Sequence, residues 1–168
     1  MKKRTRPPLR LRVVFDTDAL WCADSKPGPM SQDLYLQDIS LEWQIRTEKE
    51  SYNLEAFVKE IGKDLLVAIW GGERPHIGAV GLAQPRPSLK DPDLMSATAS
   101  VFCYPGHKED AIAKEAAEKI SSALKTNVTV TVGIHWDDID EDTIGCIVKN
   151  SRHLISRIID RISERQIL

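Results

Sequence analysis

The sequence places one alternating strand between two amphipathic helical segments, and this arrangement constrains the fold most strongly. Residues 128–136, VTVTVGIHW, alternate apolar with polar or small side chains, which is the period of a half-buried strand. Before this run, an apolar stripe at helical spacing predicts a helix from near Gly106 to near Asn127. After it, Asp140 is the expected cap of a long last helix. Each element needs an apolar partner, so the chain must form a layered domain.

Shorter apolar runs upstream supply further strands. Those expected to be strands are residues 39–48, 64–72, 76–83 and 96–104, and the last three are read as buried. Residues 72–75, GERP, separate two of these runs and predict a hairpin in which glycine supplies a positive φ. Residues 84–95 contain three prolines and are expected to be an exposed loop. The last helix should bury the stripe Ile144, Ile147, Val148, Ile155, Ile158 and Ile162.

Residues 54–62 fit two structures. Leu54, Phe57, Val58 and Ile61 match helical spacing, with Gly62 as a possible cap, whereas the alternate residues from 52 to 58 match a strand. With either choice, the order of elements predicts an α+β fold. We expect a two-layer sandwich in which a mainly antiparallel sheet of about five to six strands is covered by two helices.

Composition limits the class of protein. The 168 residues are 42% hydrophobic and 29% charged, which is typical of a globular domain. No apolar stretch approaches the roughly 18 residues that span a bilayer, so no membrane association is expected. Cys22, Cys103 and Cys146 are too few and too far apart for a disulfide framework, which favours a cytoplasmic location.

The N-terminal segment differs from the rest. Residues 1–29 carry seven basic and three acidic side chains, although the whole chain has a net charge of −2. Charged residues interrupt its apolar part, so it does not read as a secretory signal. We therefore expect a flexible basic tail over residues 1–30 and a single domain over residues 31–168. No aromatic platform accompanies the basic charge, and no nucleic acid partner is predicted.

Three histidines lie where elements of the predicted sheet end. His76 begins a strand, His107 joins a strand to a helix, and His135 ends a strand. Ligands bind most often at such places. His153, in contrast, is in the middle of the last helix and is expected to be solvated.

The segment YPGHKED, residues 104–110, fits two interpretations. Gly106 turns the chain into a helix whose first amides lack partners, and His107 and Lys108 would add positive charge for a phosphate. In the simpler interpretation, Gly106 only turns the chain, and Glu109 and Asp110 complement the helix dipole.

Other candidate sites are weaker. Ser100 lies in SATAS with two other hydroxyl residues at strand spacing, where it would bind a ligand or permit close packing. A zinc site could be composed of His76, Cys103, His107 and His135. These four residues lack the short local spacing of zinc motifs, so no metal site is predicted. No GxSxG elbow supports a serine hydrolase.

Three segments together resemble a known family: GGERPHIGAV, SATASVFCYPGHKED and VTVTVGIHWDDI. Over roughly residues 37–162 the chain resembles the LpdD-like family of prenylated-flavin chaperones, named after an accessory subunit of gallate decarboxylase. That family is similar in fold to proteasome-assembly chaperones, which are small α+β dimers, and this favours a strand at residues 54–61. The resemblance implies an accessory protein without catalytic activity that binds prenylated flavin mononucleotide (FMN), or FMN, and delivers it to a UbiD-type decarboxylase.

The resemblance also marks the residues expected to meet that cofactor. They are Gly71, Gly72, His76, Gly78, Gly106, His107, Lys108, Gly133 and His135. Histidines and a lysine can neutralise a phosphate, and glycines let the backbone approach a planar ring. An assembly chaperone that acts only through protein surfaces, as a homodimer or higher oligomer, is the alternative, and a small hydrolase acting through His107 is a third possibility.

Overall fold

The computed structural model describes residues 42–49 and 51–166. The predicted tail, and its boundary with the domain at residue 30, lie outside the described residues. The described elements are β1 (Glu42–Arg46), β2 (Leu54–Ile61), β3 (Asp64–Gly72), β4 (Ala79–Pro87), β5 (Met95–Cys103), α1 (Asp110–Leu124), β6 (Val128–His135) and α2 (Glu141–Gln166).

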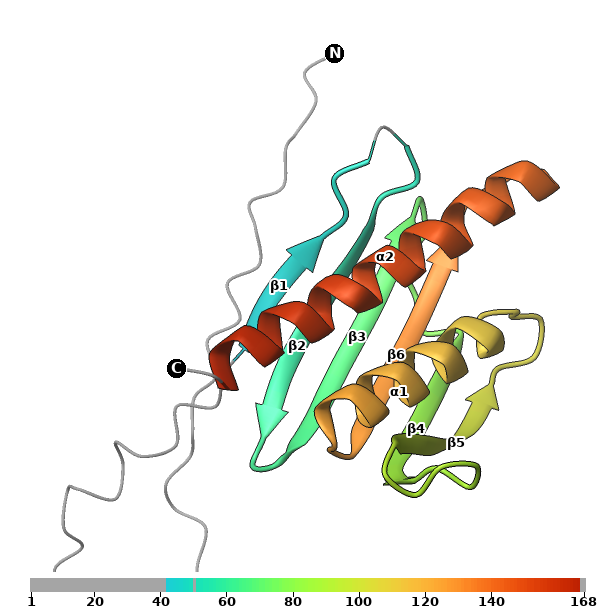
Figure 1. The fold of residues 1–168 in the computed structure, drawn as a ribbon. Helices are drawn as coiled ribbons and strands as arrows, with labels where there is room; N and C mark the ends of the chain where they lie inside the picture. The colour runs from blue at the N-terminus through green and yellow to red at the C-terminus, as the bar shows by residue number, and fades with distance from the viewer. Residues whose placement is uncertain (1–41, 50, 167–168) are drawn as a thin grey trace, which may run out of the picture. The chain divides into compact units, whose positions relative to one another are not determined.

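The strands form one sheet in the order β1-β2-β3-β6-β4-β5. Only β3 and β6 run parallel, and all other neighbours are antiparallel. Both helices lie on the same face of the sheet, α2 over β1 and β2, and α1 over β4, β5 and β6 (Figure 1). The predicted α+β two-layer sandwich is therefore confirmed. Neither helix combines the length and apolar character needed to cross a bilayer.

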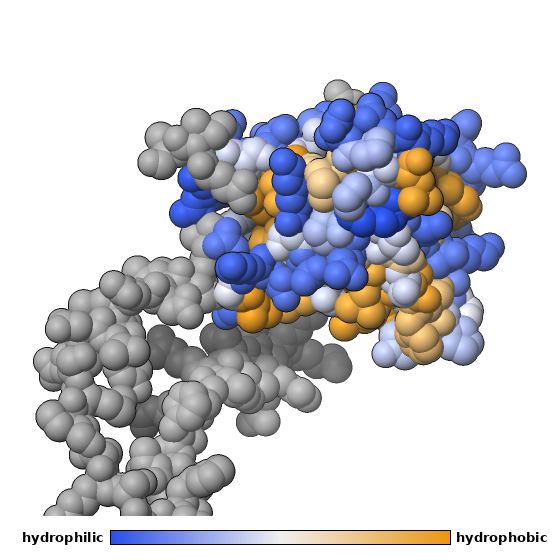
Figure 2. Space-filling model, turned by 60° about the horizontal axis from the view of Figure 1, so that its bottom comes forward, coloured by the Kyte–Doolittle hydropathy of each residue, from blue (hydrophilic) through white to orange (hydrophobic). Residues whose placement is uncertain are grey.

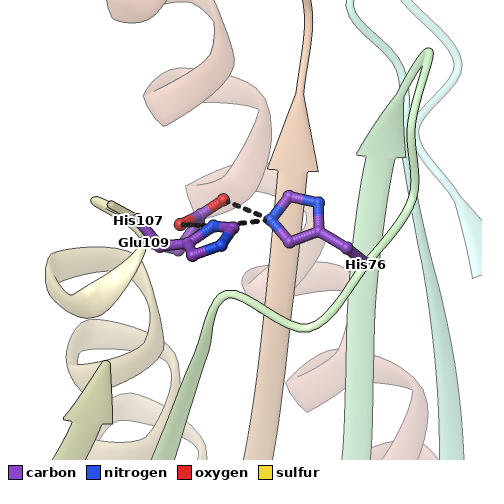
Figure 3. Close-up of side chains that lie close together, drawn as sticks. All are labelled: His76, His107 and Glu109. Atoms are coloured by element: carbon purple, nitrogen blue, oxygen red, sulfur yellow. Dashed lines mark hydrogen bonds and ion pairs between the residues drawn. The ribbon is translucent and has the colours of Figure 1, made fainter. Parts of the chain in front are cut away.

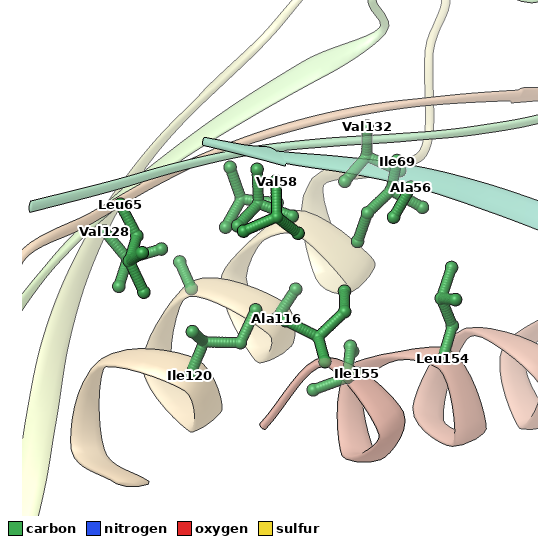
Figure 4. Close-up of a cluster of buried hydrophobic side chains, with 14 of the residues drawn as sticks. Ala56, Val58, Leu65, Ile69, Ala116, Ile120, Val128, Val132, Leu154 and Ile155 are labelled. Atoms are coloured by element: carbon green, nitrogen blue, oxygen red, sulfur yellow. The ribbon is translucent and has the colours of Figure 1, made fainter. Parts of the chain in front are cut away.

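The core fills the space between the sheet and the two helices (Figure 4). Each central strand contributes every second residue, because alternate side chains point to opposite faces of a sheet. The helices contribute residues at helical spacing. Members of this core include Ala56, Val58, Ile69, Val130, Val132, Ala116, Ile120, Leu154, Ile155 and Ile158.

Residues 54–61 form a strand and not a helix. Leu54, Ala56 and Val58 are fully buried, and the residues between them are partly exposed. The period-two pattern therefore prevailed over the helical one. Gly62, the possible helix cap, instead lies in the tight turn to β3 with a φ of 60°.

The predicted hairpin between residues 64–72 and 76–83 is wrong. β6 lies between β3 and β4 and pairs with both, so residues 73–78 carry the chain past the end of β6. The sequence-based expectation joined the two nearest strands, because nothing local indicated that a later strand would insert between them.

Two expectations about β4 and β5 also need correction. β4 starts at Ala79 and extends through Pro87, so residues 84–87 are strand and not loop. These four residues pair with β5 but not with β6, and proline is tolerated where one side of a strand is unpaired. β5 is not a buried strand: it lies at the edge of the sheet, and most of its residues are exposed or half-buried.

The helices begin close to the predicted positions. α1 starts at Asp110 and not near Gly106, because residues 104–109 form the turn out of β5. The expected cap of α2 is confirmed: Asp140 Oδ1 accepts a hydrogen bond from the Thr143 amide at 2.8 Å. Ile144 is 47% exposed, contrary to the predicted stripe, because the first turns of α2 extend beyond the sheet (Figure 1).

Candidate functional site

Three side chains from two distant segments of the chain meet at one end of the sheet (Figure 3). His76 Nε2 lies 3.0 Å from His107 Nδ1 and 3.1 Å from Glu109 Oε1. His107 Nδ1 lies 3.7 Å from the other carboxylate oxygen of Glu109. We call these three residues the His–His–Glu cluster. Their donor atoms face one another and no other side chain separates them.

His76 reaches the cluster because residues 73–78 cross β6 (Figure 3). The Glu73 amide donates to the His135 carbonyl, and the Gly78 amide donates to the Val132 carbonyl, both at 2.8 Å. A Cβ on Gly133 would lie 1.8 Å from the carbonyl oxygen of His76. The crossing therefore needs glycine at position 133 of β6.

Gly72 is required where the crossing starts. Its φ is 94°, and a Cβ there would lie 1.9 Å from the carbonyl oxygen of His135. L-residues rarely adopt this backbone conformation. Gly72 of the GGERPHIG segment therefore serves a close crossing of two backbones, where the sequence had indicated a hairpin.

Glu109 is buried although its side chain ends in a carboxyl group. Only 7% of the residue is exposed. Its Oε1 accepts the Ile134 amide at 3.2 Å and its Oε2 accepts the Lys108 amide at 3.0 Å. A Cβ on Gly78 would come within 2.5 Å of the carboxylate, so glycine at this position makes room for it. Glu109 thus points inward between β4 and β6 and makes no side-chain hydrogen bond that caps α1.

His107 is held by the turn that follows β5. Its amide donates to the Tyr104 carbonyl at 3.1 Å, and its carbonyl accepts the thiol of Cys103 at 3.4 Å. Gly106 supplies the positive φ, 86°, that this turn needs. The His107 side chain remains 34% exposed and that of His76 23% exposed, so the cluster is open to solvent on one side.

His135 lies next to the His–His–Glu cluster but is not part of it. Its imidazole centroid lies 6.2 Å from that of His76, and its Nε2 donates to Asp137 at 3.0 Å. Arg74 also bonds to Asp137, and the Arg74 carbonyl accepts the Nδ1–H of His76 at 3.0 Å. Hydrogen bonds from His135 and Arg74 hold the pKa of the Asp137 carboxyl below its ordinary value, because both donors favour the ionised form.

A depression of about 420 Å³ opens at the same end of the sheet. Aromatic side chains and the backbone of β3 form much of it, and Pro75, the neighbour of His76, is at its border. Tyr52 and Trp136 meet edge to face with centroids 5.3 Å apart. The lining residues include Arg46, Tyr52, Glu55, Trp70, Gly71, Gly72, Glu73, Pro75 and Trp136.

Most of the residues that the sequence marked lie at this end. Gly71 and Gly72 line the depression, Gly78 and Gly133 give room to the cluster, and Gly106, Lys108 and His135 surround it. Ser100 does not: it lines another depression of about 730 Å³ with Arg86, Thr98 and Val128, near the start of β6. The four-residue zinc set does not form, because Cys103 and His135 turn to other partners.

Sequence reasoning missed Glu109 as a site residue. It was interpreted as a helix-start residue that complements the dipole, and its two neighbours in the cluster gave no local sign of contact. Its position two residues after His107, in a turn out of a strand, was the available signal. Trp70 and Trp136 are far apart in the sequence, and only the tertiary structure places them around one depression.

The fold and the cluster together define a small α+β sandwich that presents imidazoles and a buried carboxylate at one end of its sheet. Residues 48–163 match the prenylated flavin chaperone LpdD-like domain, and the chain belongs to this family. It is 30% identical over 115 residues to Protein LpdD of Lactiplantibacillus plantarum, covering 67% of this chain and 79% of that one. A chain of a yeast chaperone complex for 20S proteasome assembly is similar with a TM-score of 0.47 and 13% identity, over 76% of this chain and 98% of that chain. Family membership supports an accessory or chaperone role.

Proposed function

We propose that this protein is a non-catalytic accessory protein that binds prenylated FMN, or FMN, and delivers it to a UbiD-type decarboxylase. The observation that carries the proposal is the family match over residues 48–163, within a family described as prenylated flavin chaperones. The depression beside the His–His–Glu cluster supports it, because it combines aromatic faces with exposed backbone at one end of the sheet.

The chemistry of the depression suits a flavin. Trp70 and Trp136 line the depression and offer aromatic surface to a planar ring system. Arg46 supplies a guanidinium for a phosphate. Glu55 and Glu73 also line the depression, and the Glu55 carboxylate lies 4.0 Å from Arg46, so Arg46 alone does not make the depression favourable for an anion.

The sheet also offers a surface for a protein partner. The face opposite the helices carries Leu82 and Phe102, which are 54% and 59% exposed, and Tyr104 next to them is 47% exposed. The rings of Phe102 and Tyr104 meet edge to face at 5.0 Å. Figure 2 shows separate hydrophobic patches on one view of the surface. We infer that the β4–β5 face is where the decarboxylase subunit binds.

A flavin titration tests the proposal. The purified full-length chain is titrated with prenylated FMN and with FMN, and flavin absorption is followed. We expect a saturable shift, and Trp70→Ala should weaken binding about tenfold, or about 1.4 kcal/mol. Phe102→Ala, an aromatic residue on the edge strand, is the matched control and should leave flavin binding unchanged.

The result also separates the proposal from its alternative. If neither flavin binds while a partner protein co-purifies, the chain is an assembly chaperone that acts through surfaces alone. Turnover of a substrate without any partner would instead indicate an enzyme.

A further inference from the structure

We propose that His76 Nε2, His107 Nδ1 and the carboxylate of Glu109 bind one divalent first-row transition metal ion. The inference rests on the geometry of the cluster and does not depend on flavin binding. Two imidazoles and one carboxylate are a ligand set that suits zinc or iron(II) and leaves further coordination positions open.

The separations between the donor atoms agree with a shared ion. Ligand atoms bound to one zinc at about 2.0–2.1 Å in a tetrahedral site lie roughly 3.3 Å apart. Here the two imidazole nitrogens are 3.0 Å apart, and the nitrogen–oxygen separations are 3.1 Å for His76 and 3.7 Å for His107. All the donor atoms fall within 4.8 Å of one another.

The hydrogen bonds of His76 leave its Nε2 lone pair directed at the cluster. A carbonyl oxygen only accepts, so Nδ1 must carry the proton that bonds to Arg74. In the neutral ring, Nε2 is then unprotonated and faces Glu109 Oε1 at 3.1 Å, lone pair against lone pair. A proton on His107 Nδ1 could bond to this nitrogen, but the carboxylate oxygen would still face an acceptor. A metal cation between them removes the conflict, and so does a second ring proton, which would turn the contact into an ion pair; the ¹⁵N spectra described below distinguish the two.

The surroundings of Glu109 have the features of a metal site. The Ile134 and Lys108 amides each bond to one of its oxygens and fix the orientation of the carboxylate. Each oxygen retains a lone pair for another partner. Such outer hydrogen bonds, together with the Arg74 bond to His76, orient metal ligands in known sites. A buried carboxylate also needs a compensating positive charge, and a metal ion supplies it.

The cluster is open enough to solvent for a metal ion to enter it. Glu109 is enclosed, whereas the His76 and His107 side chains are 23% and 34% exposed. An ion can therefore enter from solvent and keep a water, or a group of a second molecule, in its open positions.

Co²⁺ is a suitable probe because its visible absorption reports coordination. Untagged full-length protein, stripped with a chelator, is titrated with Co²⁺ and then with Zn²⁺. We expect one Co²⁺ per chain, displaced by Zn²⁺, and at least about a 100-fold loss of affinity in His76→Ala and in His107→Ala. His153→Ala, on the exposed side of α2, is the matched control and should bind as the wild type does.

Two further measurements remove ambiguity. Circular dichroism establishes that the variants fold, and Cys103→Ser should retain the site, since its thiol bonds to a carbonyl. In ¹⁵N spectra of the imidazoles, Zn²⁺ should shift His76 Nε2 and His107 Nδ1 and leave His76 Nδ1 protonated. The proposal is overturned if the wild type binds no Co²⁺, if both alanine variants bind as tightly, or if the metal-free His76 ring is an imidazolium that Zn²⁺ does not change.

Discussion

The carbonyl oxygen of His76 lies 1.8 Å from the point at which a Cβ on Gly133 would stand. Two segments more than fifty positions apart in the sequence therefore touch through their backbones, where residues 73–78 cross β6. This contact positions His76 beside His107 and Glu109. The cluster depends on a residue of β6 that supplies no functional group itself.

Gly133→Ala tests the crossing. A methyl group cannot fit against the backbone, so the crossing segment has to move, and we expect a loss of about 1–3 kcal/mol in the free energy of unfolding. Gly145→Ala is the control, because Gly145 lies in α2 with nothing within 4 Å of a Cβ. That substitution should be neutral or stabilise by about 0.5–1 kcal/mol. Urea titrations of both variants measure the difference, and equal effects would contradict the crossing.

Gly78→Ala should disturb the cluster more than the sheet. The new methyl group would occupy the place of the Glu109 carboxylate, which lies 2.5 Å from that Cβ position. A side chain moves more easily than backbone, so we expect β4 to persist while Glu109 leaves the two histidines. Imidazole chemical shifts of His76 and His107 should change, and amide shifts in the middle of β4 should not. An unchanged His76 signal would show that the carboxylate tolerates the methyl group.

His107→Ala combined with Lys108→Ala should weaken flavin binding by about 2–4 kcal/mol, the scale of lost charge-assisted contacts. The matched control is His153→Ala with Lys149→Ala, which removes the same residue types from α2. Titration with prenylated FMN compares the two double variants. If the first binds as well as the second, the turn after β5 is purely structural.

Phe102→Glu should abolish co-purification with the decarboxylase subunit and leave the melting temperature nearly unchanged. Phe102 is 59% exposed, so a charge there adds little strain to the fold but opposes an apolar interface. Leu89→Glu is the control, because Leu89 is 89% exposed in the loop between β4 and β5. Retention of the partner in Phe102→Glu would place the interface elsewhere.

Glu115→Gln should destabilise the chain at neutral pH but not in acid. Burial raises the pKa of Glu115, but hydrogen bonds from Lys119 and Arg152 lower it more, so the pKa lies below its ordinary value of 4.5. A lowered pKa stabilises the fold above that ordinary value, and the contribution disappears as the pH falls through the folded-state pKa.

The measurement is the difference in urea midpoint between Glu115→Gln and the wild type across this range. It should shrink as the pH falls below 4.5, and a difference that grows would contradict the sign. Glu118→Gln, on the same helix, is the control.

Much of the fold could be predicted from the spacing of apolar residues along the sequence alone. The alternation of Trp43 and Ile45, and that of Val128 to Val132, places side chains on one face regardless of which strand lies beside them. The cap of α2 at Asp140 was likewise readable, because capping involves residues three positions apart. Ile144 was predicted to be buried and is exposed, because helical spacing does not tell how far the sheet extends beneath the helix.

The site was predicted only in part. His76 and His107 lie at element ends, where ligands gather, and their meeting agrees with that reasoning. Glu109 was missed because its side chain contacts His76 and Ile134, which are distant in the sequence, and does not cap its own helix. Ser100 was grouped with the histidines, yet it lies within β5, earlier in the chain than His107, and lines a different depression.

The sequence by itself determined most of the strands and helices and, for β1 and β6, which face is buried, because these depend on the spacing of apolar residues within one segment. It left residues 54–62 open between strand and helix, and it did not show that β5 lies at an exposed edge. Only the tertiary structure decided the strand order. β6 pairs with β3 and β4 at the same time, which replaced the expected hairpin and forced residues 73–78 across Gly133. The reason is physical: strand pairing and the approach of two imidazoles to a buried carboxylate are long-range contacts, and no local pattern encodes which partner a strand edge will find.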